Sequence, residues 1–477
     1  MNYEPVIGLE VHVQLNTATK AFCGCANVFG ARENTNICPV CLGLPGSLPV
    51  LNAEVLKASA KVALALNCKI RNFIKFDRKH YFYPDLPKNF QISQFDMPLS
   101  ENGHLNIETD SGVKRVGIKR IHFEEDAGKL IHPEGAPYSL VDYNRAGTPL
   151  LEIVTEPDIH SPEDAYLYLG DLKLTLQYLG ISDCDMEKGS LRCDANISLR
   201  PAGEKKLGTK AELKNMNSFK AVRAGLEYEI RRQAQALESG ERIAQETRLW
   251  DEKKQATFSM RSKEEAHDYH YFPEPDLPPF SFDDKEIEDI RKSLPELPQE
   301  RLKRFIASFG LQSKEAAILV SDKDVADFFE KCLVVYKEAK KIANWLIGPV
   351  LYHVNLKNTD FASLKLTPEN LAALIGFVEK GTVSNLMGKD ILAVMLETGK
   401  PPDDIIREKN LAQVSNADEL ESVIEGVIAA NKKSVDDYMS GKENALMFLV
   451  GQVMRMSKGK ANPKVAKKLL TERLNKC

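Results

Sequence analysis

Alternating hydrophobic and polar residues near the start of the chain predict a half-buried β-strand over Val6–Leu15. Successive side chains of a strand point to opposite faces, so Glu10, His12 and Gln14 share one face and the intervening apolar residues share the other. A glutamate and a histidine two positions apart on one face could bind a metal ion together. A single histidine on a strand is more often a structural residue, so this pair alone leaves both interpretations open.

The densest acidic pattern is Arg120–Lys129, which holds His122, Glu124, Glu125 and Asp126 within five positions. On a strand, His122, Glu124 and Asp126 would face one way and Glu125 the other. Neighbouring carboxylates need compensating charge when they are buried, and oxygen ligands of this kind suit Mg²⁺. A solvated acidic turn is the alternative that this stretch alone allows.

Two later strands also carry polar residues at every second position. Arg192 and Asp194 share a face of the first strand, and Glu212 and Lys214 lie on the second. A strand face that mixes carboxylates with cations is either an exposed sheet surface or the floor of a binding site. Together with the acidic strands, these faces predict a polar antiparallel sheet that forms a cradle.

Helical periodicity dominates the second half of the chain. The proline-rich stretch 271–279 ends the strand-rich region, and Pro401-Pro402 separates two helical segments. The predicted fold class is α+β. We expect a cradle domain over 1–293, an all-α helical domain over 294–402 and a helical tail domain over 403–477.

The composition is that of an ordinary globular protein. The chain has 477 residues and a net charge of −4, so a nucleic-acid-binding surface would have to be local. No apolar run is long enough to cross a bilayer, and the first residues resemble neither a signal peptide nor a transit peptide. We therefore expect a cytoplasmic protein with no membrane partner, in a compartment that keeps thiols reduced.

Four of the nine cysteines are clustered. Cys23 and Cys25 are followed, after twelve residues, by Cys38 and Cys41. Two closely spaced thiolate pairs suit tetrahedral zinc, and four protein ligands leave no open position for catalysis. The sequence therefore predicts a structural zinc ion in the loop 23–41.

The segment Asp77–Lys88 is a candidate for binding phosphate. It combines Lys79 and Lys88 with aromatic residues and two prolines, which fits contacts to a phosphate and a stacked base or sugar. A structural loop anchored by its aromatic rings is equally consistent with these residues.

The end of the chain is basic. Arg455–Cys477 contains eight cations and one carboxylate, which gives a net charge of +7. Lys464, Lys467 and Lys468 are spaced at i, i+3 and i+4, so they share one helix face that could follow an RNA backbone. The alternative is a helix face that is merely solvated.

The chain contains neither a P-loop motif nor a Rossmann fingerprint. Phosphoryl transfer to a weak nucleophile needs metal ions that bridge the triphosphate oxygens and cations that stabilise the equatorial charge. The polar strand faces offer both kinds of group, so they favour a phosphoryl-transfer site built on a sheet.

Several motifs along the whole chain resemble the B subunit of the tRNA-dependent amidotransferase GatCAB, the GatB family. The matching segments are Gly8–His12, Tyr81–Lys88, Glu124–Lys129, Glu187–Ser198, Lys214–Ser218 and Tyr271–Asp276. The resemblance implies a cradle similar in fold to glutamine synthetase and guanido kinases, and a tail similar to the YqeY family. Some members of the family carry the cysteine quartet with zinc and others lack it, which supports a structural role for the metal.

The resemblance also implies the reaction. The side-chain carboxylate of Glu-tRNA(Gln), Asp-tRNA(Asn) or both would be phosphorylated with ATP and then amidated with ammonia. The ammonia would come from the A subunit, a glutaminase, and a small C subunit would complete a heterotrimer. An acyl phosphate has a good leaving group, which a carboxylate lacks. Mg²⁺ is expected because two anions, the carboxylate and the triphosphate, must meet.

The resemblance and the strand positions together assign the site residues. The expected Mg²⁺ ligands are Glu10, His12, Glu125, Asp194 and Glu212. The expected catalytic residues are Glu125, Lys79, Arg192 and Lys214. The nucleotide is expected to contact Lys88, Ser190, Arg192 and Lys214.

Two other functions fit parts of the sequence. One is a stand-alone ligase that amidates a free amino acid, but a small substrate needs neither the helical half nor the basic tail. The other is a non-catalytic RNA-binding adaptor held together by zinc, but the polar sheet faces argue against it.

Overall fold

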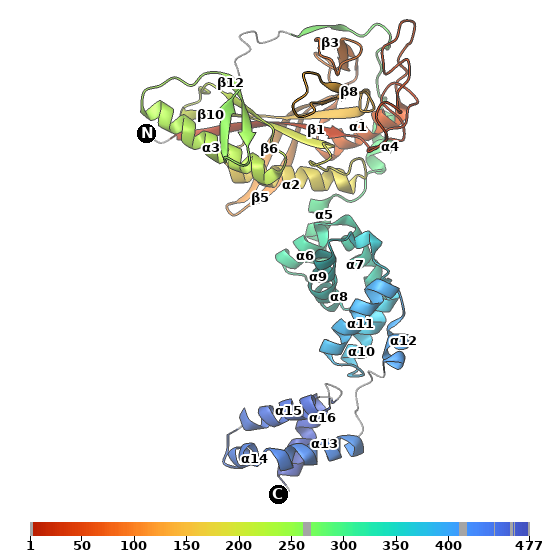
Figure 1. Cartoon of the computed structure of the whole chain (residues 1–477), viewed down its shortest axis with the longest axis vertical. Helices are drawn as coiled ribbons and strands as arrows, with labels where there is room; N and C mark the ends of the chain where they lie inside the picture. Colours follow the sequence, from red (N-terminus) through yellow and green to blue (C-terminus); the bar gives the residue numbers. More distant parts are fainter. Residues whose placement is uncertain are drawn as a thin grey trace. The chain divides into compact units, whose positions relative to one another are not determined.

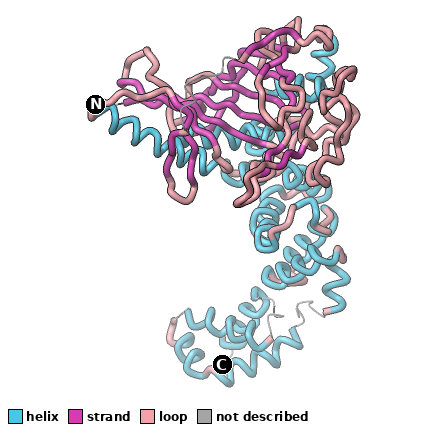
Figure 2. Tube along the Cα trace, turned by 45° about the horizontal axis from the view of Figure 1, so that its top comes forward, coloured by secondary structure: helices cyan, strands magenta, loops and turns pink. Residues whose placement is uncertain are grey.

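The computed structural model describes residues 3–260, 269–409, 417–442, 444–457, 461 and 463–475. The chain forms two compact units, Met1–Leu297 and Pro298–Cys477 (Figure 1). Within the described residues, the first unit holds the strands and the second is helical (Figure 2). This mixed architecture confirms the α+β class, whereas the division into three domains stays a prediction. None of the helices in these ranges is both long and apolar enough to span a membrane.

A nine-stranded mixed sheet organises the first unit. In spatial order its strands are β13 (Ala256–Ser259), β12 (Glu246–Asp251), β11 (Ala211–Lys214), β10 (Leu191–Pro201), β1 (Tyr3–Gln14), β9 (Pro149–Thr155), β6 (Gly112–Glu125), β5 (Ser100–Thr109) and β2 (Lys69–Ile70). Neighbouring strands are antiparallel except β11 and β12. The prediction of an antiparallel sheet is wrong at that pairing, because helix α3 (Phe219–Glu238) connects the two strands and returns the chain to the same end of the sheet.

One face of this sheet is buried against α3 and α2 (Pro162–Tyr178). Leu9 and Ile153 are completely buried on the strands, and Leu172 and Leu226 are completely buried on the helices. These residues belong to one hydrophobic core. Because strand side chains alternate, packing this face into the core directs the intervening polar residues to the opposite face.

A serine caps the N-terminus of each of the two covering helices. The Ser161 hydroxyl oxygen accepts a hydrogen bond from the Asp164 N–H at 3.0 Å, and that of Ser218 accepts one from the Ala221 N–H at 3.0 Å. Such N-caps satisfy backbone N–H groups that the first turn leaves without partners.

Smaller elements surround the end of β6. A three-stranded sheet has the order β14 (His270–Pro273), β3 (Asp77–His80) and β4 (Phe90–Ser93), and β7 (Lys129–Ile131) pairs with β8 (Leu140–Asp142). The Ile92 N–H of β4 donates to the Glu125 carboxylate at 2.9 Å. The three-stranded sheet therefore brings the loop that follows β3 next to the acidic end of β6. The first unit also contains α1 (Ala53–Ala65) and α4 (Asp284–Lys292).

The second unit is made of helices. They are α5 (Pro298–Phe309), α6 (Ser313–Val320), α7 (Lys323–Val335), α8 (Ala339–Trp345), η1 (Leu346–Val350), α9 (Leu351–Lys357), η2 (Phe361–Ser363), α10 (Pro368–Glu379), α11 (Asn385–Thr398), α12 (Pro402–Glu408), α13 (Ala417–Ala430), α14 (Lys432–Met439), α15 (Asn444–Met456) and α16 (Pro463–Leu474). The helices α13, α15 and α16 share their own apolar core, which includes Leu420, Leu449 and Leu470.

Candidate active site and metal centres

The polar face of the large sheet is organised in rows across neighbouring strands. Residues that are directly opposed in the register share a face, and the first row is His122, Glu152, His12 and Arg192, from β6, β9, β1 and β10. The next row contains Glu10, Asp194 and Lys214, from β1, β10 and β11. Asn196 on β10 pairs with Glu212 on β11, so the antiparallel register places Lys214 beside Asp194. The structure thus brings together residues that are far apart in the sequence.

Two residues of the first row and Glu124, which lies two positions from His122 on β6, form a compact group of possible metal ligands. His12, Glu124 and Glu152 each offer one ligand atom, and these three atoms lie within 4.8 Å of one another. The His12 Nε2 atom is 3.4 Å from Glu152 Oε2 and 3.7 Å from Glu124 Oε1. On the other side, His122 Nε2 is 3.1 Å from Glu152 Oε2. We call His12, Glu124 and Glu152 the carboxylate–histidine cluster.

The pKa values of the residues in and beside this cluster are shifted by burial and by their mutual charges. Burial alone would lower the pKa of His122, but the charge of Glu152 and hydrogen bonds to both glutamates raise it to about 9. Hydrogen bonding to Glu152 likewise raises the pKa of His12 against the effect of burial. The two imidazoles hold the pKa of Glu152 well below its usual range. Two almost buried carboxylates thus attract positive charge, which fits a divalent cation at this position.

Lys79 from β3 contributes a cation near the cluster. Burial lowers its pKa, but the negative charge of Glu124, with smaller contributions from Tyr271, Tyr269 and Glu152, outweighs that effect and raises it. Its ammonium nitrogen lies 4.6 Å from the centre of the Tyr269 ring, within the range of a cation–π contact. The predicted site residue Lys79 therefore lies where its charge acts on the cluster.

The second row holds the predicted residues Glu10, Asp194 and Lys214, and the predicted residue Glu212 lies two positions before Lys214 on β11. The Lys214 ammonium lies 2.6 Å from Asp194 Oδ2 and 3.1 Å from Glu212 Oε1. Glu10 accepts a hydrogen bond from the Asn196 amide at 2.9 Å. Burial, followed by the charges of Glu152 and Glu212, raises the pKa of Glu10. An added cation would therefore stabilise the charged form of Glu10. The Asp194 carboxylate is already paired with the Lys214 ammonium.

Arg192 is engaged by a carboxylate from β6. Its two terminal nitrogens donate to the two Asp126 oxygens, each at 3.1 Å. Gln14 donates to the same carboxylate at 2.7 Å, and Arg145 lies 3.6 Å from it. Although burial would raise the pKa of Asp126, the two arginines hold it below its usual range. Arg192 thus stabilises one end of the polar face and does not project as an uncommitted cation.

Glu125 lies apart from the carboxylate–histidine cluster. It follows Glu124 on the strand, and its carboxylate forms an ion pair with Lys88 and accepts the Ile92 N–H at 2.9 Å. The structure thus joins two predicted residues, Glu125 and Lys88, but places their pair on the side of the strand that faces β4 and the cysteine loop, where Lys88 packs on Gly43. A catalytic or metal-binding role of Glu125 stays a prediction.

Ser190 is held within a turn. Its hydroxyl group hydrogen-bonds the Asp183 carboxylate and accepts the Asp185 N–H at 2.8 Å. These contacts fix the loop that precedes β10. A contact between Ser190 and the nucleotide stays a prediction.

Two members of the first row were not assigned from the sequence. Glu152 lies on β9, where Leu151 and Ile153 alternate with it and are completely buried. Applying the period of two to this segment would have placed Glu152 on the polar face. His122 was recognised as part of the acidic stretch, but its lateral contact with Glu152 depends on strand order, which the sequence did not provide.

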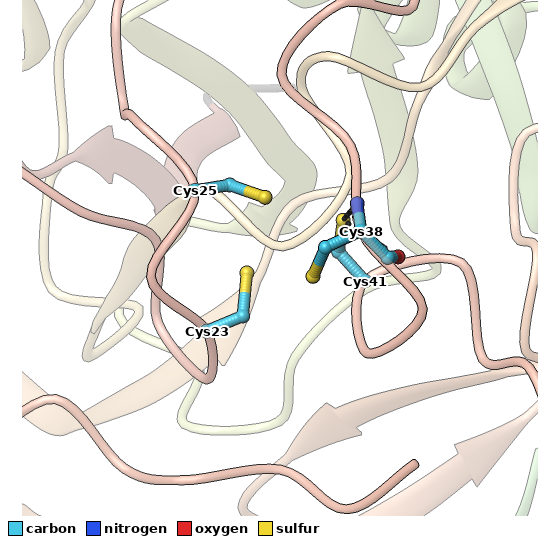
Figure 3. A group of neighbouring side chains, drawn as sticks. All are labelled: Cys23, Cys25, Cys38 and Cys41. Carbon is cyan, nitrogen blue, oxygen red and sulfur yellow. Dashed lines mark hydrogen bonds between the residues drawn. The ribbon is translucent and has the colours of Figure 1, made fainter.

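The four clustered cysteines form the second candidate metal centre. One sulfur atom from each of Cys23, Cys25, Cys38 and Cys41 lies within 4.8 Å of the others. Figure 3 shows two side chains approaching from each of two backbone segments. The Cys38 N–H donates to the Cys41 sulfur at 3.1 Å. A hydrogen bond from Cys23, opposed by burial and assisted by Cys38 and the nearby Lys20, lowers the pKa of Cys41 to about 4.

Lys20 provides a test of whether this centre suits zinc. Its side chain is completely buried, and its ammonium lies 3.7 Å from the Cys41 sulfur. The other contacts of the ammonium are the carbonyl oxygens of Asn36 at 2.8 Å and Tyr143 at 3.4 Å. A buried ammonium requires a nearby negative charge, and a zinc ion with four thiolates carries a net charge of −2. The cysteine quartet and Lys20 therefore fit a structural zinc ion.

The basic tail segment lies only partly in the described residues. Lys467 and Lys468 are exposed on α16, and Lys468 lies 3.9 Å from Glu472. The side chain of Lys464 lies outside the described part of the chain. Binding of tRNA by these lysines stays a prediction.

Known proteins similar to this chain point to one family. Residues 5–288 match the GatB/GatE catalytic domain, and residues 327–474 match the GatB domain. The chain is 55% identical to the B subunit of the aspartyl/glutamyl-tRNA(Asn/Gln) amidotransferase of Carboxydothermus hydrogenoformans over 477 residues, which cover 99% of both chains. Proteins of the same name from a Thermoanaerobacter species and from Brevibacillus brevis are 55% and 51% identical, over 100% and 99% of both chains.

Proposed function

The chain belongs to the family of aspartyl/glutamyl-tRNA(Asn/Gln) amidotransferase B subunits, and on this basis we propose that it activates and amidates the amino acid on a mischarged tRNA. The substrate is Glu-tRNA(Gln), Asp-tRNA(Asn) or both. The reaction uses ATP and ammonia. The ammonia comes from the A subunit, a glutaminase. A small C subunit completes the heterotrimer. We place this reaction in the cytoplasm.

The proposed reaction has two steps. An oxygen of the side-chain carboxylate attacks the γ-phosphorus of ATP, which forms an acyl phosphate and releases ADP. Ammonia then attacks the carbonyl carbon, phosphate leaves with the bonding electron pair, and the nitrogen loses a proton. The first step is required because a carboxylate is a poor acyl donor, whereas phosphate is a good leaving group.

The carboxylate–histidine cluster is the observation that carries this proposal. Two almost buried glutamates and an imidazole meet on the open, polar face of a sheet whose other face is packed. We assign His12, Glu124 and Glu152 to Mg²⁺, with Glu10 nearest along β1. A bound Mg²⁺ would supply the positive charge that lets the substrate carboxylate and the triphosphate approach each other.

The chain's own cations have separate roles in this proposal. Lys79, whose charge acts on the cluster, holds the substrate carboxylate for attack. Lys214 lies one strand beyond Asp194 and contacts the phosphates. Arg192 orients the polar face through its paired contact with Asp126. This division differs from the sequence assignment, in which Arg192 acted directly on the substrate or nucleotide.

The remaining parts serve binding. The cysteine quartet holds structural zinc, and the basic segment of the tail holds the tRNA body rather than the reacting end. We expect the cradle to be similar to the folds of glutamine synthetase and guanido kinases, which also use a sheet face to activate a substrate with ATP. The mixed sheet with helices on one face supports this expectation.

Transfer of label from γ-labelled ATP tests the proposed function. The assembled enzyme, without glutamine or ammonia, should transfer label to Glu-tRNA(Gln) or Asp-tRNA(Asn) but not to free glutamate or aspartate. Labelling of the free amino acid would identify a stand-alone ligase. Binding of the charged tRNA with no labelling of either substrate would identify a non-catalytic adaptor.

A further inference from the structure

Glu124 and Glu152 enter the carboxylate–histidine cluster from two strands that the chain joins by a long excursion. β6 ends at Glu125 and β9 begins at Pro149, and these two residues lie opposite each other. The excursion between them contains β7 and β8. The two glutamates meet only if this strand pair keeps its register, because a slip of one residue turns every side chain to the other face. Contacts at the base of the excursion therefore bear directly on the geometry of the cluster.

Backbone hydrogen bonds close the base of this excursion. The Asp126 N–H donates to the Thr148 carbonyl at 2.8 Å, and the Gly147 N–H donates to the Asp126 carbonyl at 3.0 Å. At the other end of the same strand pair, the register shifts between Ile118 and Arg120. Because that end is irregular, contacts at the base are needed to fix the register beside the cluster.

The side chain of Arg145 reaches across this base. Its Nε donates to the Ala127 carbonyl at 3.0 Å, and its Nη2 donates to the Gly128 carbonyl at 2.6 Å. The Nε atom also lies 3.6 Å from the Asp126 carboxylate. Gly128 is buried, and a buried carbonyl group needs a hydrogen-bond donor. A planar guanidinium presents several N–H groups in a fixed fork, so one side chain serves both carbonyls. We call these contacts the Arg145 clasp.

The turn that the clasp holds is tightly packed. The Gly128 N–H donates to the Asp85 carbonyl at 2.8 Å. A Cβ atom at Gly128 would lie 3.1 Å from that carbonyl oxygen and 3.0 Å from the carbonyl oxygen of Asp142. The turn therefore lies between two backbone segments and has one defined position, which the clasp links to the segment that leads into β9.

We infer that Arg145 is a positioning residue of the proposed reaction, because its clasp fixes the ends of β6 and β9 so that Glu124 and Glu152 meet at one Mg²⁺. The inference rests on the proposed function. Glu124 precedes the clasped turn by three residues, and Glu152 follows Thr148 by four. Arg145 acts through the backbone carbonyls of the turn. A misplacement of reacting groups by about 1 Å can lower a rate by about 100-fold.

Binding of Mn²⁺ in place of Mg²⁺, by the assembled enzyme without nucleotide, tests the inference. Electron paramagnetic resonance measures free Mn²⁺, and loss of a binding event in Glu152→Gln identifies the event that belongs to the cluster. Arg145→Met should weaken that event by about tenfold or more. Arg145→Lys should weaken it to the same extent, because a shorter ammonium group does not reproduce the planar fork.

Single-turnover phosphorylation of charged tRNA gives a second measurement. Both Arg145 variants should lower the maximal rate by at least about tenfold and leave the KM for charged tRNA unchanged. Added guanidinium ion should partly restore the rate of Arg145→Ala. Tetramethylammonium, which carries the charge but has no N–H groups, should not restore it.

Two control variants separate positioning from stability. Glu229→Gln removes a buried carboxylate that contacts Arg232 and Thr257, so it should unfold at a lower urea concentration but keep the wild-type affinity for Mn²⁺. Arg242 is an exposed arginine of the same unit. Arg242→Lys should change neither the stability nor the affinity for Mn²⁺.

Four results would overturn the inference. Wild-type Mn²⁺ affinity in Arg145→Met would show that the clasp does not position the ligands, and it would leave the proposed function intact. Wild-type affinity in Arg145→Lys would show that a positive charge alone is sufficient. An equal loss of affinity in Glu229→Gln would attribute the effect to general stability. A wild-type enzyme without any Mn²⁺ binding event that Glu152→Gln removes would overturn the proposed metal site and this inference with it.

Discussion

Glu152 and His12 lie opposite each other on neighbouring strands, with Glu152 Oε2 3.4 Å from His12 Nε2. Neither residue could form a metal centre alone. The pairing of β1 with β9 makes them neighbours, and the pairing of β9 with β6 adds His122 on the other side of the same glutamate. The register of three strands therefore creates the carboxylate–histidine cluster.

The buried ammonium of Lys20 should contribute to zinc binding. Lys20→Met keeps most of the side-chain volume but removes the charge beside Cys41. We expect zinc affinity to fall by about 10- to 100-fold, the usual effect of losing a group that supports a metal ligand. Competition with a chromogenic chelator measures this change. Lys57→Met is the control, because Lys57 is exposed and contacts Glu54. Equal zinc affinity in wild type and Lys20→Met would exclude the role.

The cysteine quartet should bind one zinc ion per chain. Replacing Cys23, Cys25, Cys38 and Cys41 with serine should abolish zinc in metal analysis and make the loop 23–41 sensitive to protease. The variant should be less stable than the wild type but should still phosphorylate the charged tRNA. A zinc ion with four protein ligands has no open position for catalysis. A wild-type protein purified without chelator and found free of zinc would refute the prediction.

The lysines of α16 should contribute to tRNA affinity. Changing Lys464, Lys467 and Lys468 to glutamate should weaken binding of charged tRNA and reduce the salt dependence by about one unit of log–log slope for each lost phosphate contact. Phosphorylation at saturating tRNA should be nearly unchanged. The control variant changes the exposed Lys205, Lys206 and Lys210 of the first unit to glutamate, which alters the net charge by the same amount. It should bind charged tRNA like the wild type. Identical binding curves for the wild type and the α16 variant would show that these lysines are only solvated.

Glu229 should be important for the stability of the cradle. Its side chain is completely buried and contacts Arg232 at 2.8 Å, Arg248 at 3.0 Å and Thr257 at 2.5 Å. Glu229→Gln should reduce the free energy of unfolding by about 2–4 kcal/mol, because Arg232 and Arg248 lose their buried counterion and keep only Glu246.

Urea unfolding measures this loss through the fluorescence of Trp250, in a Trp345→Phe background that removes the other tryptophan. Glu227→Gln, at an exposed position on the same helix, should change the stability by less than about 0.5 kcal/mol. Equal midpoints for the two variants would contradict the proposed importance of Glu229.

The sequence was most informative about features that depend on a single helix or strand, such as the face of a strand on which a side chain lies. Strand alternation correctly placed Glu10 with His12 on one face and separated Glu124 from Glu125. Assigning Glu125 to the same metal as His12 departed from that alternation. The structure brings Glu124, and not Glu125, into the group with His12 and Glu152, and a metal-binding role of Glu125 stays a prediction.

Contacts between elements could not be predicted in the same way. Nothing in the local sequence around Lys20 indicates that it is completely buried beside Cys41, and strand order had to be known before Glu152 could be placed between two histidines. The parallel pairing of β11 with β12 likewise depends on the path of α3. These features arise from the register and from tertiary packing, which residue periodicity does not encode.

Single-turnover transfer of phosphate from labelled ATP to Glu-tRNA(Gln) or Asp-tRNA(Asn), measured across a Mg²⁺ titration, tests the role of the carboxylate–histidine cluster most directly. Glu152→Gln is nearly isosteric but removes the charge that a metal requires. We predict a rate at least about 100-fold lower, a higher Mg²⁺ requirement and unchanged tRNA affinity. Glu108→Gln, on the exposed side of β5, should behave as wild type. A Glu152→Gln enzyme with the wild-type rate and the wild-type Mg²⁺ dependence would contradict the assignment.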